Sequence, residues 1–134
     1  MTAKEYLQQA FLLDRKIKSK ERQLEALKDH ARYTSPQFDN EGQPSLLIKS
    51  KLEENAVKIV ELEKSIALKV QERERLRKEI ERTIEAVNNP ECESLLRMRY
   101  LSFMDWDEIA SRMELSRSYT FKVHVRALDL VRVP

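Results

Sequence analysis

The stretch that decides the fold is DWDEIASRMELSRSYTFKVHVRALDLV, residues 105–131. Asp105 precedes Glu108 by three residues, a variant of the capping box, and this spacing predicts a short helix over 106–113. After a tight turn, Ser116 predicts the N-cap of a second helix. Two short helices joined by such a turn are typical of a helix-turn-helix, whose second helix lies in the major groove of DNA.

The second helix of this stretch is expected to have a buried and an exposed side. Helical spacing predicts a buried stripe made of Thr120, Val123, Ala127, Leu128 and Val131. Subtracting that stripe leaves six candidate DNA-binding residues on the outer surface: Arg117, Ser118, Tyr119, Phe121, Lys122 and Arg126. From Leu115 onward the local charge is +3, on a chain whose net charge is +2. Basic residues therefore gather where a DNA-binding helix needs them.

These outer residues have different expected roles. Residues 117–118 lie at the N-terminal end of the helix, where recognition helices meet base edges, and arginine can pair with guanine through two hydrogen bonds. Lys122, one turn further, could reach a base or a phosphate, and Phe121 could meet a thymine methyl group. Tyr119 and Arg126 are better placed for phosphates, which fix the register without reading the sequence.

A longer stretch resembles region 4 of bacterial sigma factors. It is RMRYLSFMDWDEIASRMELSRSYTFKVHVRALDLV, residues 97–131. The match is carried by Glu108-Ile109-Ala110, Leu115-Ser116-Arg117 and Arg126-Ala127-Leu128. The resemblance implies a DNA-binding unit. The recognition helix of sigma region 4 has more basic residues, whereas this chain has Phe121 and His124 in the corresponding helix. The resemblance therefore does not imply recognition of a minus-35-type promoter element.

The whole chain is similar to a family of small phage and prophage proteins of Gram-positive bacteria. That family combines a KEYL-like start, a charged helical hairpin and a C-terminal RYL...W..IA...S......H..AL pattern. The corresponding elements here are Lys4-Glu5-Tyr6-Leu7, Arg99-Tyr100-Leu101, Trp106, Ile109-Ala110, Ser116, His124 and Ala127-Leu128. The family is largely of unknown function and overlaps with ArpU-like late transcriptional regulators. The resemblance implies a phage-encoded transcription factor.

The residues before this unit predict a long antiparallel helical hairpin, a coiled coil, so the expected fold class is all-α. Apolar residues recur at alternating three- and four-residue steps over 2–33 and again over 45–88, as in a coiled-coil seam. Asn89 then suits an N-cap and Pro90 the first position of a shorter helix over 91–101.

A loop and a domain boundary follow from this arrangement. Two prolines and the single glycine of the chain interrupt the helical pattern and predict an exposed loop at about 34–44. Phe38 would pack against the tip of the hairpin from this loop. We predict two domains, the hairpin at 1–89 and the helix-turn-helix unit at 90–134.

The predicted second helix is longer than the first. With the turn in the middle of the loop, Tyr6 lies opposite Glu72, and the second helix extends beyond the first by about a dozen residues. Ile80, Ile84 and Val87 belong to that extension and must pack on the C-terminal unit or on another chain. This stripe is the main argument from sequence for a homodimer.

Composition argues against several other classes of function. Charged residues make up 36% of the chain and no nucleophile is paired with a base, so we predict no enzyme. Cys92 is the only cysteine, and His30 and His124 lack ligand-spaced neighbours, so neither a metal site nor a cofactor is expected. No apolar run has the roughly 18 residues of a membrane span and no secretory signal is present. We expect a cytoplasmic protein without a membrane partner.

Two functions stay open. The first is a phage or prophage transcriptional regulator that binds double-stranded DNA through a recognition helix at about 117–131. The hairpin would then serve dimerisation or contact with host RNA polymerase. With few bases on the outer surface, a single copy should bind weakly, so pairing or polymerase would supply most of the affinity. The second is a coiled-coil protein for protein interaction or phage assembly that does not bind DNA.

Overall fold

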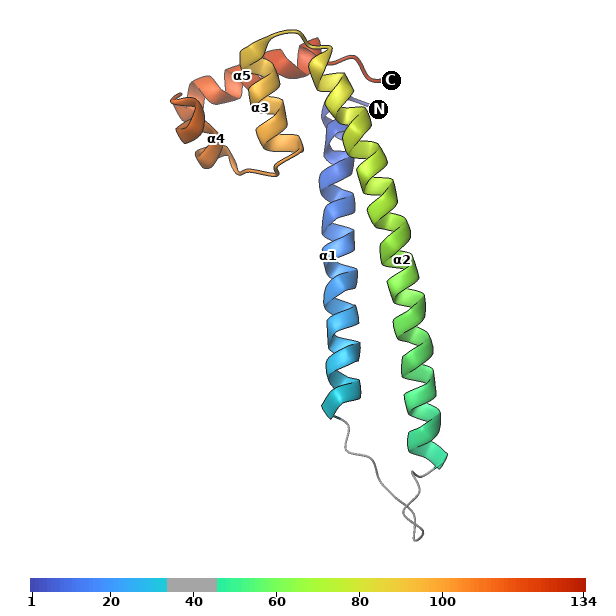
Figure 1. The fold of residues 1–134 in the computed structure, drawn as a ribbon. Helices are drawn as coiled ribbons and strands as arrows, with labels where there is room; N and C mark the ends of the chain where they lie inside the picture. The colour runs from blue at the N-terminus through green and yellow to red at the C-terminus, as the bar shows by residue number, and fades with distance from the viewer. Residues whose placement is uncertain (34–45) are drawn as a thin grey trace. The chain divides into compact units, whose positions relative to one another are not determined.

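The computed structural model of the protein describes residues 1–33 and 46–134. These residues are all-α, as predicted, and form α1 (Ala3–Tyr33), α2 (Leu46–Glu85), α3 (Pro90–Tyr100), α4 (Trp106–Met113) and α5 (Arg117–Leu130) (Figure 1). None of these helices combines the length and the apolar character that crossing a membrane requires. The predicted loop at 34–44 and the predicted packing of Phe38 lie outside the described residues.

Local capping chemistry sets the junction between α2 and α3. Asn89 caps α3 by accepting a hydrogen bond from the Cys92 N–H at 3.1 Å, and Pro90 takes the first helical position, as predicted. α2 ends at Glu85, before the predicted end at Asn88. Asn88 has a φ of 56°, and this left-handed conformation, which asparagine tolerates better than most residues, cannot continue a helix.

The chain forms two compact units. The first unit consists of Met1–Asp14 together with Glu72–Pro134, and the second unit is Arg15–Gln71. Each unit contains one segment of α1 and one segment of α2. The long hairpin over 1–89 and the domain boundary at residue 90 therefore stay predictions, and each unit is described by itself.

In the first unit, the segments of α1 and α2 run in opposite directions. The Tyr6 hydroxyl donates a hydrogen bond to the Glu79 carboxylate at 3.1 Å, and Arg73 donates to Asp14 at 2.8 Å. The prediction that Tyr6 lies opposite Glu72 is therefore wrong by about two turns of helix. The prediction placed the turn in the middle of the loop and counted outward along both helices. The alignment of two helices is instead set by which of their apolar residues are buried together. α2 consequently extends past the start of α1 much less than predicted.

The apolar stripe at the C-terminal end of α2 is covered within the first unit. Ile80 and Ile84 are 0% exposed and Val87 is 9% exposed. Leu95 and Leu96 of α3 are also 0% exposed in the same unit. The stripe therefore packs inside its own chain and offers no exposed surface to a second copy, so the argument for a homodimer from this stripe does not hold.

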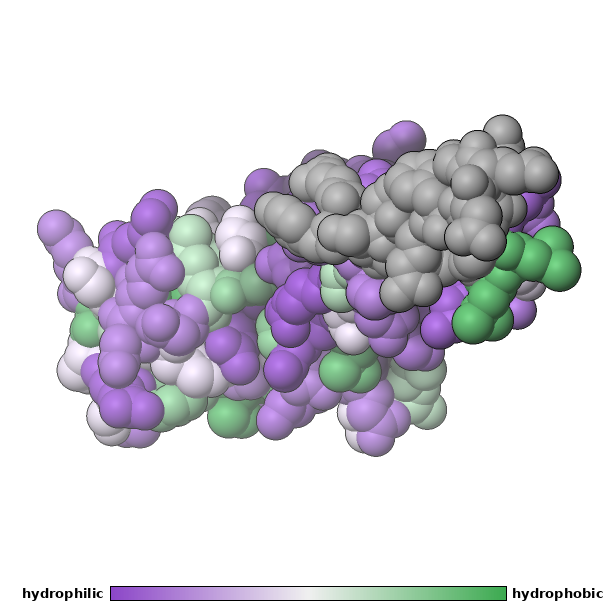
Figure 2. Space-filling view, turned by 90° about the horizontal axis from the view of Figure 1, so that it is seen from below, coloured by the Kyte–Doolittle hydropathy of each residue, from purple (hydrophilic) through white to green (hydrophobic). Residues whose placement is uncertain are grey.

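The second unit has a narrower apolar seam. Ile17 is fully buried, and Lys28 of α1 forms an ion pair with Glu63 of α2 at 3.6 Å. The half-buried apolar residues along the seam are Leu24, Leu27, Ala31, Ile59, Leu62, Ile66 and Val70. Leu52 and Ala56 continue the three- and four-residue steps predicted over 45–88, but both are exposed. Seen from below in Figure 2, apolar residues form separate green patches within a mainly hydrophilic surface.

Candidate functional site

α4 and α5 are joined by a three-residue turn with well-defined caps. Asp105 caps α4 by accepting the Glu108 N–H at 2.8 Å, and Ser116 caps α5 by accepting the Tyr119 N–H at 3.1 Å. Between them, Glu114 has φ 56° and ψ 42°, the left-handed conformation that commonly closes a helix. The predicted range of α4 and the predicted start of α5 are confirmed.

One side of α5 packs on α3 and α4. The buried residues on this side are Thr120, Val123, His124, Ala127 and Val131. The predicted stripe is thus confirmed except at Leu128, which is half-buried. His124 was in neither the predicted stripe nor the predicted outer set; only 8% of it is exposed, so it belongs to the packing side.

His124 lies in a cluster of aromatic rings drawn from three helices. Its Nε2 atom lies 2.6 Å from the Tyr100 hydroxyl, and the two rings stack with their centroids 5.8 Å apart. The Trp106 ring meets His124 in an edge arrangement at 4.5 Å, and the Arg99 guanidinium covers Trp106 at 4.7 Å from the ring centroid. The cluster joins α3, α4 and α5 and thereby fixes the orientation of α5.

Both members of the central hydrogen bond are neutral at physiological pH. Burial lowers the pKa of His124 to about 4, and the positive charges of Lys4 and Arg99 act in the same direction. Burial also raises the pKa of Tyr100 to about 12. Protonation of His124 therefore costs the folded state stability.

We predict that His124 makes the folded protein sensitive to mild acid. This histidine takes up a proton near pH 6.5 in the unfolded chain but near pH 4 in the folded chain. The stability that depends on neutral His124 is therefore fully present above pH 6.5 and is lost as the pH falls from 6.5 to 4. The free energy of unfolding should drop by about 2 to 3 kcal/mol, measured by urea unfolding at pH 7 and pH 4. His124→Phe should show a smaller drop and His30→Gln the full one. Equal drops in all three proteins would contradict the prediction.

The opposite side of α5 is exposed. All six predicted outer residues are exposed: Arg117, Ser118, Tyr119, Phe121, Lys122 and Arg126. At about 100° per residue, Ser118, Lys122, Val125 and Asp129 lie along the middle of this outer side. Val125, 60% exposed, was omitted from the predicted set, although its helical phase relative to the buried stripe could have identified it. Tyr119 and Phe121 lie on the two flanks.

The cations on this outer side are not equivalent. Arg117 lies 3.4 Å from Asp107 of α4, and both side chains are exposed. Within residues 1–33 and 46–134, no carboxylate forms an ion pair with Lys122 or Arg126. An exposed ion pair contributes at most about 1 kcal/mol, so a ligand can displace Asp107 from Arg117 at small cost. Lys122 and Arg126 are available to an anionic ligand without that step.

Phe121 is held in place from one side. Its ring packs on Trp106 with centroids 5.2 Å apart, and the Arg117 guanidinium lies 5.9 Å from its ring centroid. Phe121 remains 39% exposed, as does Tyr119. The outer side of α5 therefore combines free positive charge with fixed apolar surface.

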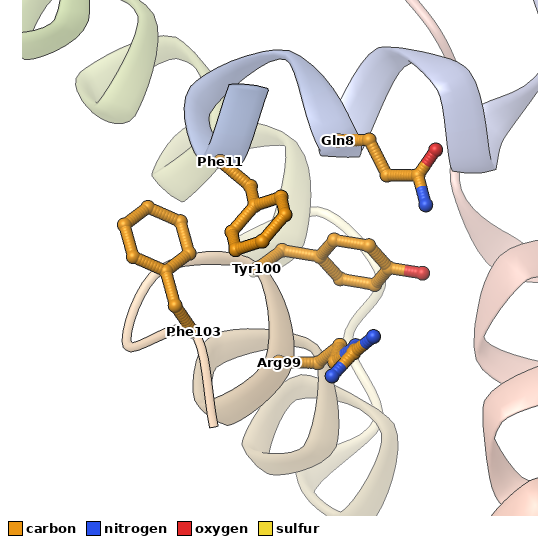
Figure 3. A pocket seen from close by; sticks show the side chains of 5 residues that line it. All are labelled: Gln8, Phe11, Arg99, Tyr100 and Phe103. Carbon is orange, nitrogen blue, oxygen red and sulfur yellow. The ribbon is translucent and has the colours of Figure 1, made fainter. Parts of the chain in front are cut away.

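A small cavity lies elsewhere in the first unit. It has a volume of about 50 Å³ and is lined by Gln8, Phe11, Arg99, Tyr100 and Phe103. Figure 3 shows Gln8 and Phe11 of α1 on one side of it and the other three side chains on the opposite side. Because one water molecule takes about 30 Å³ of liquid, this cavity has no room for a nucleotide or similar cofactor. Within the described residues, no three His, Cys, Asp or Glu side chains are grouped to hold a metal ion.

A family model described as a protein of unknown function (DUF1492) matches residues 39–131, which include the candidate site. No curated protein and no solved structure matches the chain.

Proposed function

The chain belongs to the DUF1492 family of proteins of unknown function, and from its own residues we propose that it is a transcriptional regulator that binds double-stranded DNA. α4 and α5 would act as a helix-turn-helix, with α5 as the recognition helix. The observation that carries the proposal is the exposed outer side of α5, where neither Lys122 nor Arg126 pairs with a carboxylate of the described residues. The resemblance to sigma region 4 and to ArpU-like phage regulators supports the same function.

The middle of the outer side is proposed to face base edges. Lys122 would donate hydrogen bonds to guanine O6 and N7 or to a phosphate, and Ser118 would bond a neighbouring base. Val125, with 60% of its surface exposed beside them, would contact the methyl group of a thymine. Such a set would read a short mixed sequence through two polar contacts and one apolar contact.

The two flanks of α5 are proposed to have different roles, one on the DNA backbone and one on bases. Tyr119 and Arg126 share one flank and would bind phosphates, which position the helix without reading sequence. On the other flank, Phe121 would reach a second thymine methyl group while Trp106 supports its ring. Arg117 would exchange Asp107 for guanine at the N-terminal end of the helix.

A single copy of this surface should bind DNA weakly. Each phosphate contact contributes through counterion release, and α5 presents only three exposed cations: Arg117, Lys122 and Arg126. A second copy of the chain or the host RNA polymerase would supply the remaining affinity. In a dimer, two recognition helices would need half-sites about 34–36 Å apart or a multiple of that spacing.

Selection of binding sites from random duplex DNA tests the proposal. The full chain should enrich a common site, and its binding to that site should resist a large excess of random DNA. A pool with no enriched site, together with binding that random competitor removes completely, would rule out a sequence-specific regulator.

One observation favours a second candidate function, docking of a protein on α5 without DNA. The exposed apolar residues of this helix are Tyr119, Phe121, Val125 and Leu130. Such a surface also suits a protein partner, as in a coiled-coil interaction or phage assembly protein. The two candidates differ in salt dependence, because DNA affinity falls steeply with added salt while apolar docking does not.

A further inference from the structure

The outer side of α2 in the second unit carries a second regular series of residues. The half-buried residues Ile59, Leu62 and Ile66 mark the side that faces inward. On the opposite side, positions follow alternating four- and three-residue steps, and all of them are exposed: Leu46, Ser50, Glu53, Val57, Val60, Lys64, Ala67 and Gln71. Steps of this kind are the repeat by which one helix packs along another in a coiled coil.

The centre of this series is apolar and hollowed. Val57 is 56% exposed and Val60 is 49% exposed. A shallow groove of about 380 Å³ runs from Val57 and Val60 to Lys64, and another of about 440 Å³ runs from Ser50 to Val57. Side chains of a facing helix could enter such grooves as knobs enter holes.

The charges of the series are arranged symmetrically about this centre. Glu53 precedes Val57 by four residues and Lys64 follows Val60 by four residues. If two copies of α2 pack antiparallel so that Val57 meets Val60 of the other copy, Glu53 of each copy meets Lys64 of the other. The same pairing places Ser50 opposite Ala67. Parallel packing would instead bring Glu53 against Glu53 and Lys64 against Lys64, which repel.

We propose that this outer side of α2 binds a second copy of the same chain, antiparallel, through two valines from each copy flanked by two Glu53–Lys64 ion pairs. The surface complements itself, as a two-fold interface requires, because each residue finds its partner at the symmetry-related position. The small apolar core predicts a weak association that depends on concentration. This inference does not depend on DNA binding, although it would supply the second copy that a weak recognition helix needs.

Sedimentation equilibrium of the full chain without DNA tests the contact. The wild-type chain should form a concentration-dependent dimer. Glu53→Lys alone and Lys64→Glu alone should each weaken it at least tenfold, because each change creates two like-charged pairs per dimer. The double variant Glu53→Lys with Lys64→Glu restores opposite charges and should return the association to near the wild-type value. Glu25→Lys, an exposed acid of α1, is the control and should change nothing.

Three results would overturn the proposal. One is a wild-type chain that stays monomeric at all concentrations measured. Another is a dimer whose strength neither single charge reversal changes. The third is a double variant that associates as weakly as the single variants while circular dichroism shows unchanged helix content.

Discussion

Replacing Ile84 with alanine should lower the free energy of unfolding by about 3 to 4 kcal/mol. Ile84 is 0% exposed in the first unit, next to the fully buried Ile80 of the same helix. Truncating a buried isoleucine loses its transfer free energy and leaves a cavity that rigid neighbours cannot fill. Urea unfolding of the full chain at pH 7 measures the loss.

A matched control and a change of concentration complete this experiment. Leu68→Ala removes an apolar side chain that is 68% exposed, and it should change stability by less than about 0.5 kcal/mol. The loss of stability in Ile84→Ala should be the same at low and high protein concentration, because residues of the same chain bury Ile84. A loss that grows with concentration would mean that a second copy covers the stripe.

Replacing both Lys122 and Arg126 with alanine should weaken DNA binding by about 10- to 100-fold near physiological salt. Both side chains are exposed on α5, so their removal should leave folding intact. The slope of log affinity against log salt should become shallower by about two, because DNA binding releases about one counterion fewer for each cation removed. Fluorescence anisotropy at several salt concentrations gives both quantities.

The control for this experiment is Lys16→Ala, which removes an exposed base of α1 from the second unit. It should leave both affinity and salt slope unchanged. If the double variant binds DNA as tightly as the wild type, with the same slope, then α5 is not the DNA-binding surface.

Local chemistry made the C-terminal helices predictable. Asp105 and Ser116 each accept a hydrogen bond from the backbone N–H three residues later in the chain. The starts of α4 and α5 therefore depend on only a few neighbouring residues. The exposed positions of α5 follow from its 3.6-residue period and the buried stripe. Val125, Asp129 and Leu130 are also exposed on this helix, but they were not in the predicted set.

Contacts between distant residues were not predictable in the same way. The register that brings Tyr6 to Glu79 depends on which apolar residues of two helices are buried together, and the length of the loop does not determine it. His124 is buried because Tyr100 and Trp106 arrive from two other helices. Asp107 reaches Arg117 across the turn, a proximity that depends on the angle between α4 and α5.

The most direct test of the central claim, that the outer side of α5 binds DNA, is an NMR titration of the ¹⁵N-labelled chain with the DNA site that selection enriches. The account predicts that amide signals shift most at Ser118, Lys122 and Val125, with smaller shifts on the flanks at Tyr119 and Arg126. Signals of α1 over residues 15–31 should stay where they are. Unchanged α5 signals at saturating DNA, or shifts confined to other helices, would contradict the claim.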